Sequence, residues 1–287
     1  MASSIANTRL ALWDNIADMI QEALNISQGG SSMSEGDAFG RFLVLEVMTR
    51  SQPVNIAVDE KRRVSGLLQV PGAARVCYVL AHGAGAGMSH PFMAAIADGL
   101  AERDIATLRY QFPYIEEGSR RPDNPKVAQA TVRAAVSEAL RLVPELALVA
   151  GGKSFGGRMT SEAQAASPLP GVQGLVFLGF PLHPPGRPSD ERGAHLFEIK
   201  VPMLFLQGTR DALAATELVE ALVLRLGGRA SLKLFQDADH SFHVPARTGR
   251  KDADVRAEML DELSIWLGAI MQLRRKARLT STAIHNS

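Results

Sequence analysis

The chain has 287 residues, of which 46% are hydrophobic and 21% charged, a composition typical of globular proteins and unlike that of disordered or fibrous chains. Its 31 Lys and Arg residues nearly balance 30 Asp and Glu residues, which leaves a formal net charge of +1. Such a balance provides no strong positive potential that would attract nucleic acid or an acidic membrane surface, so neither is expected as a partner.

The cysteine content and the start of the chain favour the cytoplasm. The single cysteine, Cys77, has no second cysteine to pair with, and we interpret it as a buried apolar side chain. Asp14, Asp18 and Glu22 interrupt what would be the apolar part of a secretory signal. No run reaches the roughly 18 apolar residues of a membrane span, so we predict a cytoplasmic protein without a membrane partner.

Residues 1–50 are predicted to form an extension outside the main domain. Apolar side chains at spacings of three and four indicate one amphipathic helix over 8–26, and the run 29–32 provides a flexible linker. Three interpretations stay open: docking on the domain, pairing with a partner, or an upstream start with Met48 as the true first residue. Whether the chain forms a homo-oligomer stays open too.

Strand-like and helix-like segments alternate along the rest of the chain. Strands are predicted at 54–59, 63–70, 75–81, 105–110, 146–150, 174–180, 203–207 and 231–235. Helices are predicted at 91–102, 126–142, after Ser154, at 213–226 and at 252–273. This alternation is typical of a mostly parallel central sheet with helices on both faces, which makes the fold class α/β. We therefore predict one domain over 51–275, followed by a basic tail over 276–287.

The clearest chemical motif is the pattern G-x-S-x-G at residues 152–156, between a predicted strand and a predicted helix. The sharp turn requires glycine on both sides of Ser154 and exposes the serine hydroxyl at the carboxyl end of the sheet. The backbone N–H of Phe155 lies at a helix start, where it could stabilise an oxyanion. A phosphate-binding loop is the alternative, but that pattern requires glycine where Ala147 stands.

A second glycine-rich turn, at residues 82–87, follows an earlier predicted strand. We predict that the backbone N–H of Ala84 is the other oxyanion donor, with Gly83 and Gly85 beside the substrate. The histidine that begins this turn is interpreted as the residue that holds it in place. A dinucleotide-binding fingerprint starting at Gly83 would require glycine at position 88, where Met88 stands.

A nucleophilic serine needs a base, and the base needs an anion to orient it. Asp211 and His240 each follow a predicted strand, so both would lie with Ser154 at the edge of the sheet where such folds bind ligands. His240 is predicted to take the serine proton and Asp211 to hold the imidazole, without a metal ion or an organic cofactor. The alternatives are His243 for the base, and Asp237 or Asp239 for the acid.

These motifs, with residues 109–114 and 207–211, resemble the α/β-hydrolase superfamily over about residues 54–275. They are similar to a small lidless subgroup that includes the hydrolase-like domains of a testis-expressed protein and of a subunit of the non-specific lethal chromatin complex. Dienelactone hydrolases are more distant and use cysteine where this chain has Ser154. The resemblance implies an α/β-hydrolase fold and a serine hydrolase acting on a small ester or thioester. The alternative is a catalytically silent interaction module.

The expected binding site is open to a small-molecule substrate. A lid normally enters this fold after the sixth strand, but here only a short, proline-rich insert over 181–188 follows, so we predict minimal or no lid. Lys153 and His183 are predicted to contact the substrate. Several arginines near the same edge are interpreted either as an anion site or as solvated or structurally paired charges: Arg109, Arg120, Arg121 and Arg187.

Overall fold

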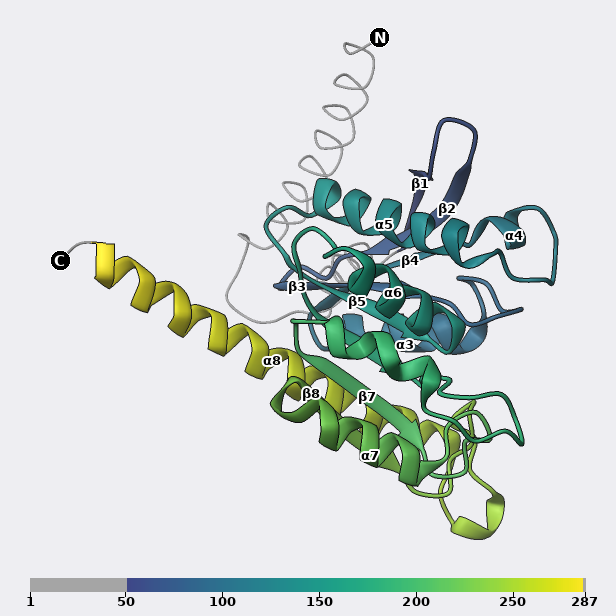
Figure 1. Cartoon of the computed structure of the whole chain (residues 1–287). Coiled ribbons are helices and arrows are strands. Elements are labelled where there is room, and N and C mark those ends of the chain that lie inside the picture. Colours follow the sequence, from purple (N-terminus) through teal and green to yellow (C-terminus); the bar gives the residue numbers. More distant parts are fainter. Residues whose placement is uncertain (1–50, 286–287) are drawn as a thin grey trace, which may run out of the picture. The chain divides into compact units, whose positions relative to one another are not determined.

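The computed structural model describes residues 51–285, so the helix and linker predicted within residues 1–50 lie outside the described part of the chain. Eight strands form one sheet in the order β1-β2-β4-β3-β5-β6-β7-β8 (Figure 1). The strands are β1 (Gln52–Ala57), β2 (Arg63–Gln69), β3 (Val76–Ala81), β4 (Ile105–Tyr110), β5 (Ala147–Lys153), β6 (Val172–Leu178), β7 (Met203–Gly208) and β8 (Ala230–Phe235). The pairs β1–β2 and β2–β4 are antiparallel and the others parallel, which confirms the predicted sheet.

Helices cover both faces of this sheet (Figure 1). They are α3 (Pro91–Ala101), α4 (Pro113–Glu116), α5 (Pro125–Leu142), α6 (Phe155–Ala166), α7 (Thr216–Leu226) and α8 (Asp252–His285), with 3-10 segments η1 (Glu191–Glu198), η2 (Gly227–Arg229) and η3 (Ala246–Thr248). One apolar core joins the sheet to α5, α6 and α7, and a second joins it to α3 and α8. Strand β3 serves both cores because its side chains alternate between the two faces.

Some elements differ from the predicted ones. Helix α8 continues to His285 instead of ending near residue 273. Strand β5 runs through the two glycines to Lys153, because Gly151 and Gly152 pair in register with β3 and β6. Helix α4 and segment η1 lie where no element was predicted.

The connection between β6 and β7 is short and carries η1 as its one regular element. Within the part of the chain that the structure describes, no helical lid covers the carboxyl end of the central strands, as the short proline-rich insert predicted. Within residues 51–285, no helix combines the length and the apolar character that a bilayer crossing requires.

Candidate active site

Ser154 occupies the turn between β5 and α6 in a conformation that L residues rarely adopt, with φ 50° and ψ −116°. The turn packs closely against the end of β3. A Cβ atom on Gly152 would lie 2.2 Å from the Ala81 carbonyl oxygen, and one on Gly156 would lie 2.5 Å from the His82 carbonyl oxygen. The motif therefore needs glycine at both positions because backbone atoms fill the space that a side chain would take.

The structure brings Ser154, His240 and Asp211 together in one hydrogen-bonded chain. His240 Nε2 lies 2.8 Å from Ser154 Oγ, and His240 Nδ1 lies 2.6 Å from Asp211 Oδ2. Ser154, His240 and Asp211 follow β5, β8 and β7, so the carboxyl ends of these parallel strands place them at one edge of the sheet. The Asp211 side chain is fully buried whereas Ser154 and His240 are partly exposed, which leaves the hydroxyl accessible from solvent.

Asp211 is held by two further donors besides the imidazole. Gln207 Nε2 lies 2.5 Å from Asp211 Oδ2, and the backbone N–H of Leu213 donates to Oδ1 at 2.8 Å. Gln207 is itself fixed, because its Oε1 accepts the backbone N–H of Phe180 at 2.9 Å. Gln207 was not among the predicted site residues, although a polar residue inside an otherwise apolar strand is a signal that could have indicated it.

His82 holds the glycine-rich loop at residues 82–87. Its Nδ1 lies 2.8 Å from the Gly83 carbonyl oxygen, and its Nε2 accepts the backbone N–H of Phe112 at 3.2 Å. Nε2 acts as an acceptor here, so Nδ1 carries the proton and the ring is neutral. Burial lowers the pKa of His82 to about 4, which keeps it neutral at physiological pH. Tyr114 adds a second support, since its hydroxyl accepts the N–H of Gly85 at 3.0 Å.

The loop at residues 82–87 lies against the nucleophile turn. A Cβ atom on Gly83 would lie 3.7 Å from Ser154 Cβ, so the loop backbone borders the serine. Among the described residues, no group accepts the N–H of the exposed Ala84. Phe155 is the first residue of α6, where backbone N–H groups have no partner within the helix. Phe155 directly follows Ser154 and Ala84 directly follows Gly83, and no group among the described residues accepts either N–H.

Two of the predicted substrate contacts have other partners in the structure. His183 Nδ1 lies 2.9 Å from the Pro184 carbonyl oxygen, and Nε2 accepts the N–H of Ala215 at 2.8 Å, so this buried ring braces its own loop. Gly85 uses its N–H on Tyr114, as described above. The ring of His183 and the N–H of Gly85 therefore have partners within the chain, which differs from the predicted contact with substrate, and the backbone of Gly83 borders Ser154.

Lys153 extends from the end of β5 toward the loop that carries His240. Its Nζ donates to the His240 carbonyl oxygen at 2.5 Å and lies 5.4 Å from the centre of the Phe242 ring. Burial lowers the pKa of Lys153 to about 8, and the attraction of Asp211 and Asp239 offsets part of this effect. Its ammonium group therefore has a partner within the chain, which differs from the predicted contact with substrate.

The alternative base and acids are engaged elsewhere. His243 is 63% exposed in its side chain and pairs with Asp252 at 2.9 Å, which raises the pKa of His243. Asp239 accepts the backbone N–H groups of Ser241 and His243, and Asp237 lies 3.9 Å from Arg247. In the described structure His243 does not contact Ser154 Oγ, and neither Asp237 nor Asp239 contacts the His240 ring, so the geometry favours His240 and Asp211.

Of the four arginines, Arg109 has a clear structural task. Its buried guanidinium donates to the Met88 carbonyl oxygen at 3.2 Å and to Ser51 Oγ at 3.1 Å, which ties β4 to the end of the glycine-rich loop. It is therefore not an anion site at the edge of the sheet. Arg120, Arg121 and Arg187 are exposed.

A second serine and histidine pair lies nearby but lacks the rest of the arrangement. Ser161 Oγ lies 2.8 Å from His195 Nε2, the same distance as in the Ser154 pair. However, Ser161 donates its hydroxyl hydrogen to the Arg158 carbonyl oxygen and is buried. Burial, reinforced by the charge of Arg158, lowers the pKa of His195 to about 4, so this ring is a weak base. The Ser161 pair therefore serves as an internal comparison for Ser154.

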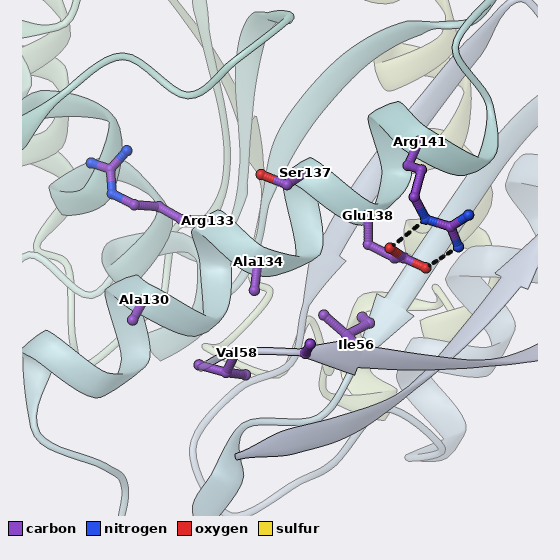
Figure 2. Close-up of a pocket in the computed structure, with 9 residues that line it drawn as sticks. Ile56, Val58, Ala130, Arg133, Ala134, Ser137, Glu138 and Arg141 are labelled. Atoms are coloured by element: carbon purple, nitrogen blue, oxygen red, sulfur yellow. Dashed lines mark hydrogen bonds and ion pairs between the residues drawn. The ribbon is translucent and has the colours of Figure 1, made fainter. Parts of the chain in front are cut away.

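A hollow of about 490 Å³ lies between β1 and α5 (Figure 2). None of the residues that line it belongs to the turn that carries Ser154. Its acidic side chain, Glu138, is bound by Arg141 through hydrogen bonds of 2.6 and 2.9 Å. Arg133 instead donates to the backbone carbonyls of Ala163 and Ser167. The hollow has no nucleophile with an adjacent base, so we assign the chemistry to the Ser154 site.

Comparisons with known proteins agree with this architecture. A family model described as an alpha/beta hydrolase domain matches residues 74–268. Similar solved structures include dienelactone hydrolase from Anabaena variabilis, with 20% identity and a TM-score of 0.63 over 77% of this chain and 97% of that one. A lidless α/β serine hydrolase from Xanthomonas campestris has 20% identity and a TM-score of 0.59 over 76% and 95%. These likenesses confirm the predicted fold.

Proposed function

The chain belongs to the alpha/beta hydrolase family, and from that premise we propose that it is a serine hydrolase with a Ser154–His240–Asp211 triad. The observation that carries the proposal is the continuous hydrogen-bonded chain from Ser154 Oγ through the imidazole to the buried Asp211 carboxylate. Its order and geometry suit a nucleophile, a general base and an orienting anion.

In the proposed reaction, His240 Nε2 accepts the hydroxyl proton while Ser154 Oγ attacks the substrate carbonyl. Asp211 accepts a hydrogen bond from Nδ1–H, so it selects the tautomer with a free Nε2 and stabilises the imidazolium that forms. The imidazolium then protonates the leaving group. A water molecule, activated by the same imidazole, hydrolyses the acyl-enzyme and releases the acid.

The N–H groups of Phe155 and Ala84 are proposed to bind the oxyanion that develops on the substrate carbonyl oxygen. Support comes from the place of Phe155 directly after Ser154, from the approach of Gly83 to the serine, and from the contacts of His82 and Tyr114, which fix the loop before substrate arrives. Donors that are already oriented stabilise a developing charge without reorganisation, and the loss of one such donor costs about 10²- to 10³-fold in rate.

A small ester or thioester in the cytoplasm is the substrate that we propose. The short connection between β6 and β7 supports an open site, which suits a small or extended molecule better than a long enclosed acyl chain. Among structures of the same fold, Est1E from Butyrivibrio proteoclasticus binds ferulic acid, at 15% identity to this chain. Similarity to the testis-expressed protein and to the non-specific lethal complex subunit stays a prediction.

A serine-directed fluorophosphonate probe tests the proposal, because labelling requires an activated nucleophile. Mass spectrometry should locate the label on Ser154, and Ser154→Ala should abolish both labelling and hydrolysis of short p-nitrophenyl esters. Ser161→Ala is the matched control, since Ser161 has a histidine at the same distance but no comparable site around it. The probe should label the Ser161→Ala variant at the wild-type rate.

A folded wild-type protein that resists the probe would favour the alternative, a silent hydrolase-like module that binds a partner. Labelling that persists in Ser154→Ala and disappears in Ser161→Ala would move the nucleophile to α6.

A further inference from the structure

The dipeptide Lys153–Ser154 contacts His240 at two points. Ser154 Oγ meets the imidazole at Nε2, whereas Lys153 Nζ donates to the backbone carbonyl oxygen of the same histidine. The lysine approaches past the end of β6, where a Cβ atom on Gly179 would lie 3.0 Å from Nζ and 3.4 Å from the His240 carbonyl oxygen. A side chain at position 179 would therefore displace the ammonium group from this contact.

The loop that carries His240 needs such support. It follows β8 and contains two residues other than glycine with positive φ, Asp237 at 60° and Phe242 at 64°. Such conformations are maintained only when surrounding contacts fix them. The Phe242 ring packs 5.4 Å beneath the Lys153 ammonium group and stacks on Phe92, so the lysine contacts the loop through both a carbonyl and a ring.

We propose that Lys153 is a positioning residue, which fixes the His240 loop through the His240 carbonyl and so aligns the imidazole with Ser154. This inference rests on the hydrolase function proposed above. Lys153 acts through the histidine backbone, so it is distinct from the residues that would touch the substrate. Misplacement of a catalytic group by about 1 Å can cost about 10²-fold in rate, so a backbone contact of this kind can control turnover.

Charge makes this contact dependent on pH. Three titratable groups face Lys153: Asp211 after β7, and Asp239 and His240 after β8. Burial lowers the pKa of Lys153 to about 8 despite the attraction of the two carboxylates. Below that pH the ammonium group makes a charge-assisted hydrogen bond, and above it the neutral amine makes a weaker one. The rate of the Ser154 reaction should therefore fall at alkaline pH with a midpoint near 8.

Two substitutions separate charge from bulk. Lys153→Met retains a long apolar side chain without a donor, whereas Lys153→Arg retains a cation that does not titrate in this range. The measured quantity is the rate constant for fluorophosphonate labelling between pH 7 and 10. At pH 7.5 we expect Lys153→Met to label about 10- to 100-fold more slowly. Lys153→Arg should restore most of the rate and lose the alkaline decline.

The matched control is Arg229→Met. Arg229 also donates to backbone carbonyls, those of Phe197 at 3.1 Å and Ile199 at 2.6 Å, but it contacts none of the three site residues. This variant should keep the wild-type rate and pH profile even where its melting temperature is lower. Melting curves of all variants at each pH show whether a loss of labelling accompanies unfolding.

The outcomes distinguish this inference from the function on which it rests. A wild-type protein that never labels overturns the proposed function. A wild-type protein that labels equally well from pH 7.5 to 10, or a folded Lys153→Met variant that labels at the wild-type rate, overturns the role of Lys153 and leaves the triad intact. If Lys153→Met does not fold, the Lys153→Arg variant still provides a test. A labelling rate that falls at alkaline pH in Lys153→Arg as it does in the wild type also overturns the role of Lys153.

Discussion

Asp211 is the most constrained side chain of the site, because three donors converge on its two oxygens: His240 Nδ1, Gln207 Nε2 and the Leu213 backbone N–H. All three donors require acceptors, so the carboxylate is the form that fits. A carboxamide in its place would put an NH₂ group against at least one of these donors. The contacts therefore predict that the charge at position 211, and not merely its size, sets the imidazole tautomer.

Asp211→Asn should lower kcat by about 10⁴-fold, the loss seen when the same change favours the wrong tautomer in a serine protease. Steady-state hydrolysis of p-nitrophenyl acetate measures this effect, with circular dichroism to verify the fold. KM should change much less, because Asp211 is buried behind the histidine. An Asn variant within tenfold of the wild-type kcat would contradict the assignment of the acid.

The two histidines near the end of β8 differ in surroundings and should differ in effect. His240→Ala removes the base and should reduce hydrolysis to the background of Ser154→Ala, whereas His243→Ala removes an exposed pair with Asp252 and should change activity little. Rates of ester hydrolysis for the two variants, measured at one pH, decide the point. An inactive His243→Ala beside an active His240→Ala would reassign the base.

Individual residues were predictable from the sequence to different degrees. Ser154, Asp211 and His240 could be proposed because each follows a predicted strand, and parallel strands deliver their carboxyl ends to one edge. The hydrogen bond of Gln207 to Asp211 and that of Lys153 to the His240 carbonyl oxygen could not, because each depends on the direction that an individual side chain takes in the folded protein. The contacts of His183 with Pro184 and Ala215 were not predictable for the same reason.

At the scale of elements, helix α5 has a complete start signal. Asn124 precedes it, and its side-chain oxygen accepts the backbone N–H of Val127 at 3.1 Å, while Pro125 occupies the first helical position. The helix packs on the core through Ala128, Val132 and other buried residues of its inner face. The cap itself is exposed and lies outside the site, so it contributes to stability alone.

Asn124→Ala should therefore lower the free energy of unfolding by about 1 kcal/mol. For a domain of this size the melting temperature should fall by about 2–4 °C. Differential scanning calorimetry measures the change, and labelling of Ser154 should be unaffected. Asn124→Asp is the matched control, because a carboxylate also caps a helix start and should preserve the melting temperature. An unchanged melting temperature in the alanine variant would show that the cap is dispensable.

Most elements were predictable because their sequences have a strong periodic pattern, and the elements that were not predicted lack one. The apolar run at 105–110 became β4 with the predicted bounds, since every residue in it is buried. Helix α4 has only four residues, too few for a helical period to appear in the sequence. Glycines usually indicate a turn, which is why β5 was predicted to end at Ala150, three residues before its observed end at Lys153.

At the scale of the whole molecule, residues 51–285 contain a complete sheet with both faces covered. The core beneath α5, α6 and α7 begins at Ile56, and the core beneath α3 and α8 extends to Leu267. Ser51 is the first described residue with a core contact, because its hydroxyl accepts a hydrogen bond from the buried Arg109. We therefore expect the part of the chain that the domain needs for folding to begin close to residue 51.

Removal of residues 1–47 should therefore leave a protein that unfolds cooperatively and still labels at Ser154. Every strand that the structure describes, both cores and the Ser51–Arg109 contact are retained, so the melting temperature should stay within a few degrees of the full chain. Thermal unfolding by circular dichroism measures it. Removal of residues 1–57 is the matched control, because it also deletes β1 and the core residue Ile56 and should melt at a much lower temperature. Loss of cooperative melting in the shorter deletion would mean that the N-terminal residues contribute to the stability of the domain.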